Sequence, residues 1–163
     1  MPEYLIWGGG GHGKVVADAA RLAGLHIRGF VDSDSAKEGT LAEPGGGRII
    51  VSEADFLKSV ANGDLPDGVD GVILAIGSNS ARQRCRLRLP VAFLTTVIHP
   101  GAMVSPNAII GIGSVVLAGA VVNSSARLGS GCIINSGAIV EHDCLVGDDA
   151  HVAPRAVLAG GVK

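Results

Sequence analysis

Aromatic residues, cysteines and excess charge are all scarce in this sequence, and each scarcity excludes a class of protein. Only 3% of the 163 residues are aromatic, so the core must be built from aliphatic side chains. Three cysteines without framework spacing argue against a secreted disulfide scaffold. A net charge of −2 leaves no basic field for nucleic acid, and no apolar run reaches the roughly 20 residues that cross a bilayer. We therefore expect a cytoplasmic protein whose partners include neither nucleic acid nor a membrane.

Glycine and aliphatic side chains are the abundant residues. There are 25 glycines, hydrophobic residues make up 47% of the chain, and the mean hydropathy is +0.42. A glycine-rich, aliphatic and aromatic-poor composition is typical of a repetitive β structure. The longest basic run, residues 82–88, is predicted to be the solvent-facing side of a helix, with phosphate contact as the alternative.

The first hundred residues alternate between strand and helix patterns. The expected elements are a strand at 4–7, a glycine loop at 8–13, a helix at 14–23, a strand at 27–31, a turn at 43–48, a short helix at 51–60 and a buried strand at 71–76. Gly24 ends the first helix, and Ser52 is the expected N-cap of the second. This order predicts a right-handed βαβ unit with its ligand crevice at the carboxyl ends of the strands.

The first glycine loop has the spacing of a nucleotide-binding turn. Gly8, Gly10 and Gly13 satisfy GxGxxG, and Asp32 follows Gly13 by 19 residues, where a ribose-binding acid would lie. Because the βαβ region ends near residue 97, it is too short for the two halves of a dinucleotide site. We therefore expect a mononucleotide, with its phosphates over the helix N-terminus. A glycine turn that binds no ligand is the alternative.

Two polar features lie beside this loop. His12 stands between two glycines at its mouth, which is an unusual place for a core histidine and makes it a candidate ligand contact. A solvated loop histidine is the alternative. Ser78 and Asn79 follow the later buried strand and are expected on the same carboxyl edge of the sheet.

From residue 102 onward the sequence divides into ten six-residue repeats without a gap. The third position of every repeat is aliphatic: Val104, Ile110, Val116, Val122, Leu128, Ile134, Val140, Val146, Val152 and Leu158. The first position is always small: Ala102, Ala108, Ser114, Ala120, Ala126, Cys132, Ala138, Cys144, Ala150 and Ala156. A large and a small inward residue that recur every six positions, rather than every two, predict a triangular coil. We therefore expect a left-handed parallel β-helix, which is a stacked solenoid.

Two details fit this coil. Gly111, Gly129 and Gly147 recur every 18 residues, which is three sides and hence one full turn. Cys132 and Cys144 occupy small inward positions, so we expect them to pack in the core rather than to act as nucleophiles.

Seven segments spread over nearly the whole chain match the pattern of one family. They are Gly8–Gly13 with His12, Phe30–Asp32, Ala75–Asn79, Ile98–Pro100, Asn135, Ile139–Asp143 and His151–Ala153. In order and spacing they resemble the bacterial sugar acyltransferases of the sialic-acid, bacillosamine and perosamine N-acetyltransferase type. The resemblance implies a Rossmann-like nucleotide-sugar-binding domain over residues 1–97 and a left-handed β-helix acyltransferase domain over residues 98–163, incomplete at its C-terminus.

His142 is the catalytic candidate. It lies two positions after the inward Val140, so it faces outward, between Glu141 and Asp143. A neighbouring carboxylate can orient an imidazole for general-base catalysis. A surface histidine on a solvated corner is the alternative. His151 also faces outward, and the resemblance places its counterpart beside the base in the acceptor site.

The resemblance implies direct transfer of an acetyl group from acetyl-CoA to the amine of a nucleotide-linked amino-deoxy sugar, without a metal. His142 would take the amine proton, and the backbone N–H of Gly160 would stabilise the oxyanion. Gly160 and His151 would contact the acetyl-CoA. The residues expected to bind the nucleotide sugar are Gly10, Gly11, His12, Gly13, Asp32, Ser33, Ser78, Asn79, Asn135 and His151. Members of the family are trimers with sites in the grooves between subunits, so a homotrimer is expected.

Four points stay open. Relatives often carry a second acid where this chain has Ser33, so the nucleotide base is undetermined. A γ-type carbonic anhydrase, another trimeric β-helix, needs three zinc-binding histidines, whereas the coil contains only His142 and His151. A non-catalytic nucleotide-sugar-binding or scaffold trimer gains support because the repeats stop at Lys163, as in a fragment or a shortened chain. O-acetylation of a sugar hydroxyl would use the same residues.

Overall fold

The computed structural model describes residues 1–40 and 49–163. The turn predicted at residues 43–48 lies outside the described residues. The N-terminal part contains a parallel four-stranded sheet in the order β3-β2-β1-β4. Its strands are β1 (Glu3–Trp7), β2 (His26–Asp32), β3 (Ile49–Ser52) and β4 (Gly71–Leu74). The predicted βαβ unit is confirmed, and β4 ends two residues earlier than expected because Ala75 and Ile76 already belong to the loop that follows.

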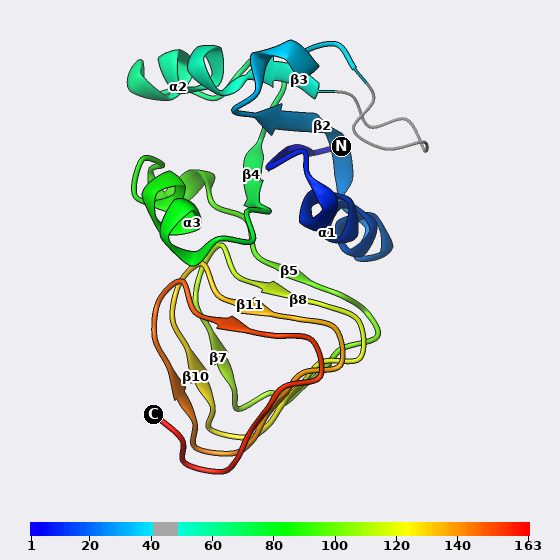
Figure 1. The fold of residues 1–163 in the computed structure, drawn as a ribbon, viewed down its shortest axis with the longest axis vertical. Helices are drawn as coiled ribbons and strands as arrows, with labels where there is room; N and C mark the ends of the chain where they lie inside the picture. Colours follow the sequence, from blue (N-terminus) through cyan, green and yellow to red (C-terminus); the bar gives the residue numbers. More distant parts are fainter. Residues whose placement is uncertain (41–48) are drawn as a thin grey trace.

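Three helices surround this sheet (Figure 1). They are α1 (Gly11–Leu22), α2 (Glu53–Ala61) and α3 (Asn79–Arg86), and the short 3-10 turns η1 (Ser35–Lys37) and η2 (Val91–Phe93) complete this part. Helix α1 begins at Gly11 rather than at Lys14, so half of the predicted glycine loop is in fact helical. Ser52 caps α2 as predicted, because its hydroxyl accepts a hydrogen bond from the Asp55 N–H at 3.2 Å.

Residues 97–158 wind into a parallel β-helix whose triangular cross-section is visible in Figure 1. Every strand is two residues long and pairs in parallel with the strand one turn away. The three sheets have the orders β14-β11-β8-β5, β15-β12-β9-β6 and β13-β10-β7. The strands are β5 (Val97–Ile98), β6 (Met103–Val104), β7 (Ile109–Ile110), β8 (Val115–Val116), β9 (Val121–Val122), β10 (Arg127–Leu128), β11 (Ile133–Ile134), β12 (Ile139–Val140), β13 (Leu145–Val146), β14 (His151–Val152) and β15 (Val157–Leu158).

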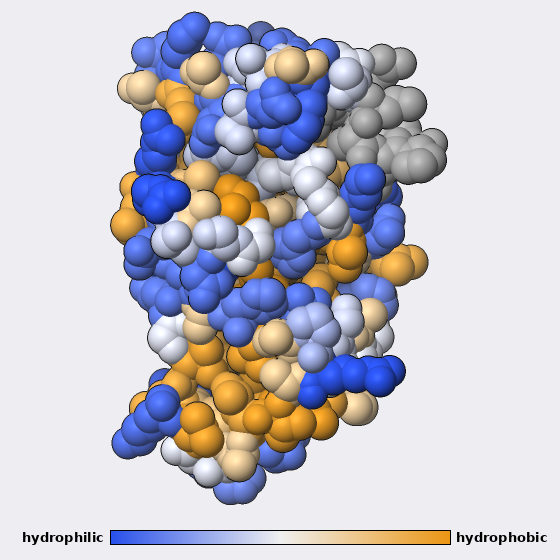
Figure 2. All heavy atoms as spheres, viewed as in Figure 1, coloured by the Kyte–Doolittle hydropathy of each residue, from blue (hydrophilic) through white to orange (hydrophobic). Residues whose placement is uncertain are grey.

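The predicted phase of the repeat is confirmed. The third-position aliphatic residues and the small first-position residues line a single core, in which Val140, Ile134 and the thiols of Cys132 and Cys144 are fully buried. Gly111 marks a corner where the coils approach closely, since a Cβ there would lie 2.5 Å from the Ser130 nitrogen. Figure 2 shows hydrophobic side chains gathered over the last coil.

The N-terminal part packs against one outer face of the coil. Outward residues of the β5–β8–β11 sheet, including Val115 and Ile133, form one buried cluster with Val16 and Ala17 of α1. Each fully buried aliphatic side chain stabilises by roughly 1.5–3 kcal/mol, so this contact holds the two parts together. The crevice of the small sheet is therefore held above one side of the β-helix.

Candidate active site

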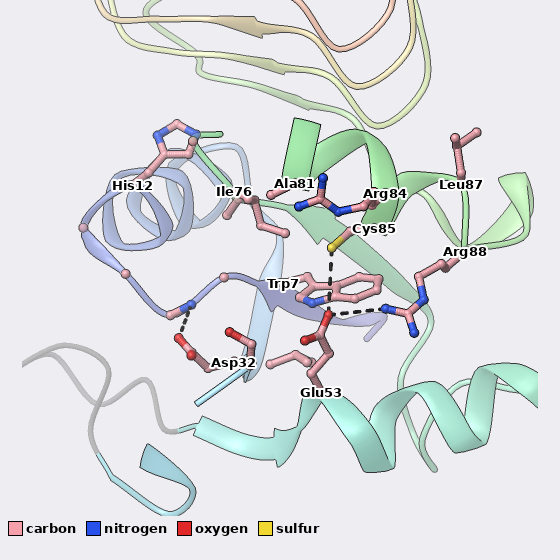
Figure 3. A pocket seen from close by; sticks show the side chains of 18 residues that line it. Trp7, His12, Asp32, Glu53, Ile76, Ala81, Arg84, Cys85, Leu87 and Arg88 are labelled. Carbon is pink, nitrogen blue, oxygen red and sulfur yellow. Dashed lines mark hydrogen bonds and ion pairs between the residues drawn. The ribbon is translucent and has the colours of Figure 1, made fainter. Parts of the chain in front are cut away.

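A cavity of about 940 Å³ lies at the carboxyl edge of the small sheet, as predicted for a ligand crevice (Figure 3). Its wall combines the glycine loop with the ends of β1, β2 and β4 and one side of α3. The lining residues are Trp7, Gly8, Gly9, Gly10, Gly11, His12, Val31, Asp32, Ser33, Glu53, Ala75, Ile76, Gly77, Ala81, Arg84, Cys85, Leu87 and Arg88.

Two glycines of the loop leave no room for a Cβ, and two others border open space. Gly8 has φ +124°, and a Cβ there would lie 2.5 Å from the Ala75 carbonyl oxygen. A Cβ on Gly13 would collide with the Gly8 carbonyl group. Around Gly10 and Gly11 there is open space instead, and no side chain within the described ranges 1–40 and 49–163 caps the N-terminus of α1. The first N–H groups of this helix therefore face the cavity without an intrahelical partner, which is a ready anion site.

Asp32 supports the glycine loop from the end of β2. Its Oδ2 accepts the Gly9 N–H at 3.1 Å, and its Oδ1 accepts the Asp34 N–H at 2.9 Å. The Lys37 ammonium lies 3.4 Å from both oxygens. The carboxylate lines the cavity, but most of its acceptor capacity is already used within the protein.

His12 lies on the first turn of α1, between the cavity and the coil. Burial, and then electrostatic interaction with His151 and with Arg82, lower the pKa of His12 to about 4. Its Nε2 is buried and has no hydrogen-bond partner among the described residues. An imidazole that is neutral at physiological pH and has an unpartnered nitrogen suits a hydrogen bond to a bound ligand.

Ser33, Ser78 and Asn79 differ in their positions. Ser33 lines the cavity as expected. The Ser78 hydroxyl caps α3 by accepting the Ala81 N–H at 3.4 Å, and the Asn79 side chain binds Arg82. Neither Ser78 nor Asn79 is part of the cavity wall, where Gly77 stands instead.

A second polar group surrounds His142 at a corner of the β-helix. The His142 Nδ1 lies 2.8 Å from Oδ2 of Asp143, which adopts the left-handed backbone conformation with φ 61°. Glu141 takes no part in this pair, because its Oε2 accepts a hydrogen bond from Asn123 at 2.7 Å. A Cβ added to Gly160 would lie 2.7 Å from Nε2 of His142, so the Gly160 backbone lies directly against the imidazole.

His151 belongs to a different side of the coil. It begins β14 and its Nε2 lies 2.9 Å from the amide nitrogen of Asn135, so the two residues predicted to share the acceptor site are in contact. Burial, and then Arg82, lower the pKa of His151. His142 follows β12 in another sheet, and no hydrogen bond or ion pair among residues 1–40 and 49–163 joins it to His151.

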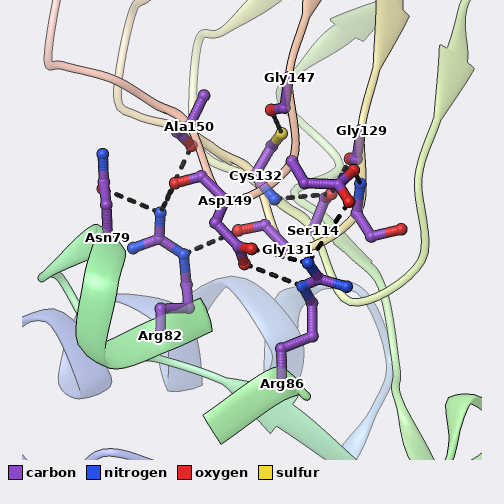
Figure 4. Close-up of polar contacts among 12 residues, drawn as sticks. Asn79, Arg82, Arg86, Ser114, Gly129, Gly131, Cys132, Gly147, Asp149 and Ala150 are labelled. Atoms are coloured by element: carbon purple, nitrogen blue, oxygen red, sulfur yellow. Dashed lines mark hydrogen bonds and ion pairs between the residues drawn. The ribbon is translucent and has the colours of Figure 1, made fainter. Parts of the chain in front are cut away.

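The expectation that residues 82–88 form one solvated helix face is wrong. Arg82 is fully buried and connects α3 to the coil (Figure 4). Its guanidinium donates to the carbonyl oxygens of Gly131 at 2.7 Å, Ile76 at 2.7 Å and Asp149 at 2.6 Å, and to Oδ1 of Asn79 at 3.0 Å. The arginine can be buried because carbonyl groups of the coil accept hydrogen bonds from its guanidinium. The sequence of a basic run does not show whether carbonyl groups of a distant segment will lie within reach of it.

Arg86, one turn further along α3, makes the second bridge to the coil. Its Nε and Nη2 bind the two carboxylate oxygens of Asp149 at 2.9 and 2.7 Å. Asp149 is 4% exposed, so this bidentate pair is largely shielded from water. Together Arg82 and Arg86 join the loop after β4 to the residues that immediately precede His151.

Two kinds of feature are missing from the described part of the chain. No helix there is long and apolar enough to span a membrane. No three His, Cys, Asp or Glu side chains within residues 1–40 and 49–163 gather in a way that could hold a metal ion. The zinc site that a carbonic anhydrase needs is therefore not found among these residues.

Known proteins share both halves of this architecture. Residues 3–89 match the PglD N-terminal domain, and residues 125–160 match the bacterial transferase hexapeptide model of six repeats. Over 119 residues the chain is 38% identical to UDP-N-acetylbacillosamine N-acetyltransferase from Bacillus subtilis (strain 168). That match covers 68% of this chain and 49% of the relative, so the chain spans about half the length of that curated protein.

Solved structures extend the comparison to nearly the whole chain. The acetyltransferase domain of PglB from Neisseria gonorrhoeae FA1090 superposes with a TM-score of 0.82 at 36% identity, covering 98% of this chain and 75% of that one. PerB from Caulobacter crescentus, in complex with CoA and GDP-perosamine, gives a TM-score of 0.82 at 34% identity, covering 99% and 73%. The chain therefore belongs to the family of bacterial sugar acetyltransferases in which a PglD N-terminal domain precedes a hexapeptide-repeat left-handed β-helix.

Proposed function

We propose that this protein transfers an acetyl group from acetyl-CoA to the amine of a nucleotide-linked amino sugar, with His142 as the general base. The observation that carries the proposal is the contact of one imidazole with Asp143 on one side and the Gly160 backbone on the other. A candidate base, a carboxylate that can orient it and the Gly160 backbone thereby lie together at one corner.

The geometry suggests a division of roles between the two imidazole nitrogens. When Nδ1–H donates to Asp143, the Nε2 lone pair is available beside Gly160. The sugar amine would attack the thioester carbonyl carbon of acetyl-CoA, forming the C–N bond while Nε2 takes the amine proton. The backbone N–H of Gly160 would donate to the oxyanion of the tetrahedral intermediate, and collapse of that intermediate would break the C–S bond and release CoA.

No covalent acyl-enzyme is needed on this route. Cys132 and Cys144 face the interior of the coil and are fully buried, and their sulfur atoms donate to the carbonyl oxygens of Gly147 and Ala159 at 3.2 Å. Burial raises the pKa of the Cys132 thiol, which keeps it protonated. A buried, protonated thiol is a poor nucleophile, so direct transfer is the simpler chemistry.

The nucleotide would lie in the cavity of the N-terminal part. Its phosphates would accept hydrogen bonds from the open N-terminus of α1 and from His12, and its ribose would lie near Asp32. The amino sugar would extend toward His151, which interacts electrostatically with His12, and toward Asn135, which contacts His151. Two relatives support this assignment, because one is named as an acetyltransferase of a UDP-linked sugar and the other was solved with CoA and GDP-perosamine.

We also propose a homotrimer, because the two polar groups lie on different sides of one coil. The outer face of the β6–β9–β12–β15 sheet carries only aliphatic and methionine side chains at its outward positions, and Met103 and Val157 are 64% and 61% exposed. His142 follows β12 on this face. Packing of a second copy here would bury the apolar stripe and cover His142 with residues of the partner.

Light scattering on the purified protein is expected to give three times the chain mass of 16.4 kDa. Replacing Met103 and Val157 together by glutamate is expected to give single chains, because like charges would then face each other in the contact. The double change of the exposed Val91 and Leu87 to glutamate is the control, and it should leave the mass unchanged. A single-chain mass for the unmodified protein contradicts the proposal.

The activity itself is tested with a panel of acceptors. The protein is incubated with acetyl-CoA and UDP-, GDP- or dTDP-linked 4-amino sugars, and release of the CoA thiol is followed. We expect turnover with at least one amino sugar and none with the matching 4-hydroxy sugar. Turnover with the hydroxy sugar alone would indicate O-acetylation. Nucleotide-sugar binding without any turnover would instead identify a binding or scaffold protein.

A further inference from the structure

We propose that Glu53 and Arg88 form the nucleobase subsite of the cavity and that the base they select is guanine. The inference rests on the proposed function, because it assumes that a nucleotide occupies this cavity. Glu53 is the first residue of α2, and Arg88 follows the end of α3, so the two residues reach the cavity from opposite sides (Figure 3).

The carboxylates of the cavity differ in their free acceptor capacity. Asp32 already accepts two backbone N–H groups and contacts an ammonium group. Among residues 1–40 and 49–163 the Glu53 carboxylate has only distant partners, because its Oε1 lies 3.8 Å from Nη1 of Arg88 and 3.9 Å from the sulfur of Cys85. The first distance is too long for a hydrogen bond, and the second involves a weak donor. Glu53 is therefore the carboxylate that a ligand with N–H donors would satisfy.

The Glu53 carboxylate lies in a partly buried site beside an aromatic ring. The Glu53 side chain is 23% exposed. Trp7 lies beside it and is fixed by an edge-on contact with Phe56, with ring centroids 4.9 Å apart. Burial, and then the charge of Glu53, raise the pKa of the Cys85 thiol to about 11, so Cys85 remains a neutral neighbour.

The chemistry of the pair matches one base. The Watson–Crick edge of guanine carries the O6 acceptor beside two adjacent donors, N1–H and N2–H. A carboxylate accepts both donors with its two oxygens, while a guanidinium alongside donates to O6. Uracil and thymine offer one N–H between two carbonyl groups, so the second carboxylate oxygen would face an oxygen atom. Adenine and cytosine each present one amino donor beside a ring nitrogen that is an acceptor. One carboxylate oxygen would therefore also lack a donor.

The order of the binding groups along the cavity matches the order of phosphate, ribose and base in a nucleotide. The open N-terminus of α1 is at one end, Asp32 is the last residue of β2, and Glu53 follows the neighbouring strand β3. Since β2 and β3 are adjacent in the sheet, their carboxyl ends lie side by side. Phosphate, ribose and base would thus meet the helix terminus, Asp32 and Glu53 in that order.

Calorimetric titration of the unmodified protein with GDP, IDP, UDP and ADP tests the inference without any variant. IDP lacks only the 2-amino group of GDP. We expect GDP to bind about tenfold or more tightly than each of the other three, since only guanine offers two adjacent donors to the carboxylate. Equal binding of GDP and IDP, or tighter binding of UDP or ADP, overturns the guanine assignment and leaves the proposed function standing. If none of the four nucleotides binds, both the guanine assignment and the proposed function are overturned.

The Glu53→Gln variant tests whether Glu53 causes the difference in affinity between GDP and IDP. We expect it to remove most of the difference between GDP and IDP, because a single amide oxygen replaces two carboxylate oxygens. Glu38→Gln is the matched control, as Glu38 is exposed and outside the cavity, and it should leave the difference intact. A preference for GDP over IDP that persists in a folded Glu53→Gln protein, checked by its melting temperature, also overturns the inference.

Discussion

Replacing His142 by alanine is expected to lower kcat by about 10²–10⁴-fold while KM for both substrates changes little. General-base catalysis contributes on this order, and the imidazole at this exposed corner makes no core contact whose loss would disturb the fold. The measurement is the steady-state rate of CoA release with the amino sugar that gives turnover. His142→Gln should be similarly impaired, because an amide cannot accept the amine proton.

Two further changes make this result specific. Asp143→Asn should give a smaller loss than His142→Ala, because the base remains while the carboxylate that orients it is replaced. His26→Ala is the matched control, since this exposed histidine at the start of β2 has no proposed role, and its kcat should equal that of the unmodified protein. Undiminished turnover in His142→Ala would exclude His142 as the base.

Replacing Arg82 by methionine is expected to lower the free energy of unfolding by about 3–5 kcal/mol. Methionine fills a similar volume, but it leaves the carbonyl groups of Gly131, Ile76 and Asp149 without their donor inside the protein. Unsatisfied buried acceptors cost roughly 1–3 kcal/mol each, and loss of one partner of a buried charged network costs a similar total. Urea denaturation followed by circular dichroism measures the change.

The neighbouring arginines provide the controls for this stability prediction. Arg84→Met on the same helix should change stability by less than about 0.5 kcal/mol, because Arg84 is exposed. Arg82→Lys should recover little, since an ammonium group cannot reach carbonyl groups in several directions at once. If Arg82→Met is as stable as Arg84→Met, the contacts of Arg82 do not hold α3 to the coil.

The sequence by itself determined the elements that depend on local patterns. The six-residue period placed every inward aliphatic residue and both coil cysteines correctly, because side-chain direction in a coil follows from position in the repeat. Gly8 and Gly13 were also predictable, since their backbone and packing exclude a Cβ. The outward position of His142 beside Asp143 followed from the same phase.

Side-chain contacts between residues that are far apart in the sequence became known only from the tertiary structure. Arg82 is buried against carbonyl groups that lie 49 and 67 residues away in sequence. Glu141 is hydrogen-bonded to Asn123 rather than to His142. The Asp32 carboxylate is bound by Gly9 and Asp34, and Glu53 lies in the wall of the cavity. The physical reason is that a polar side chain is positioned by whichever donors and acceptors lie within reach, and distant segments supply these only once the chain has folded.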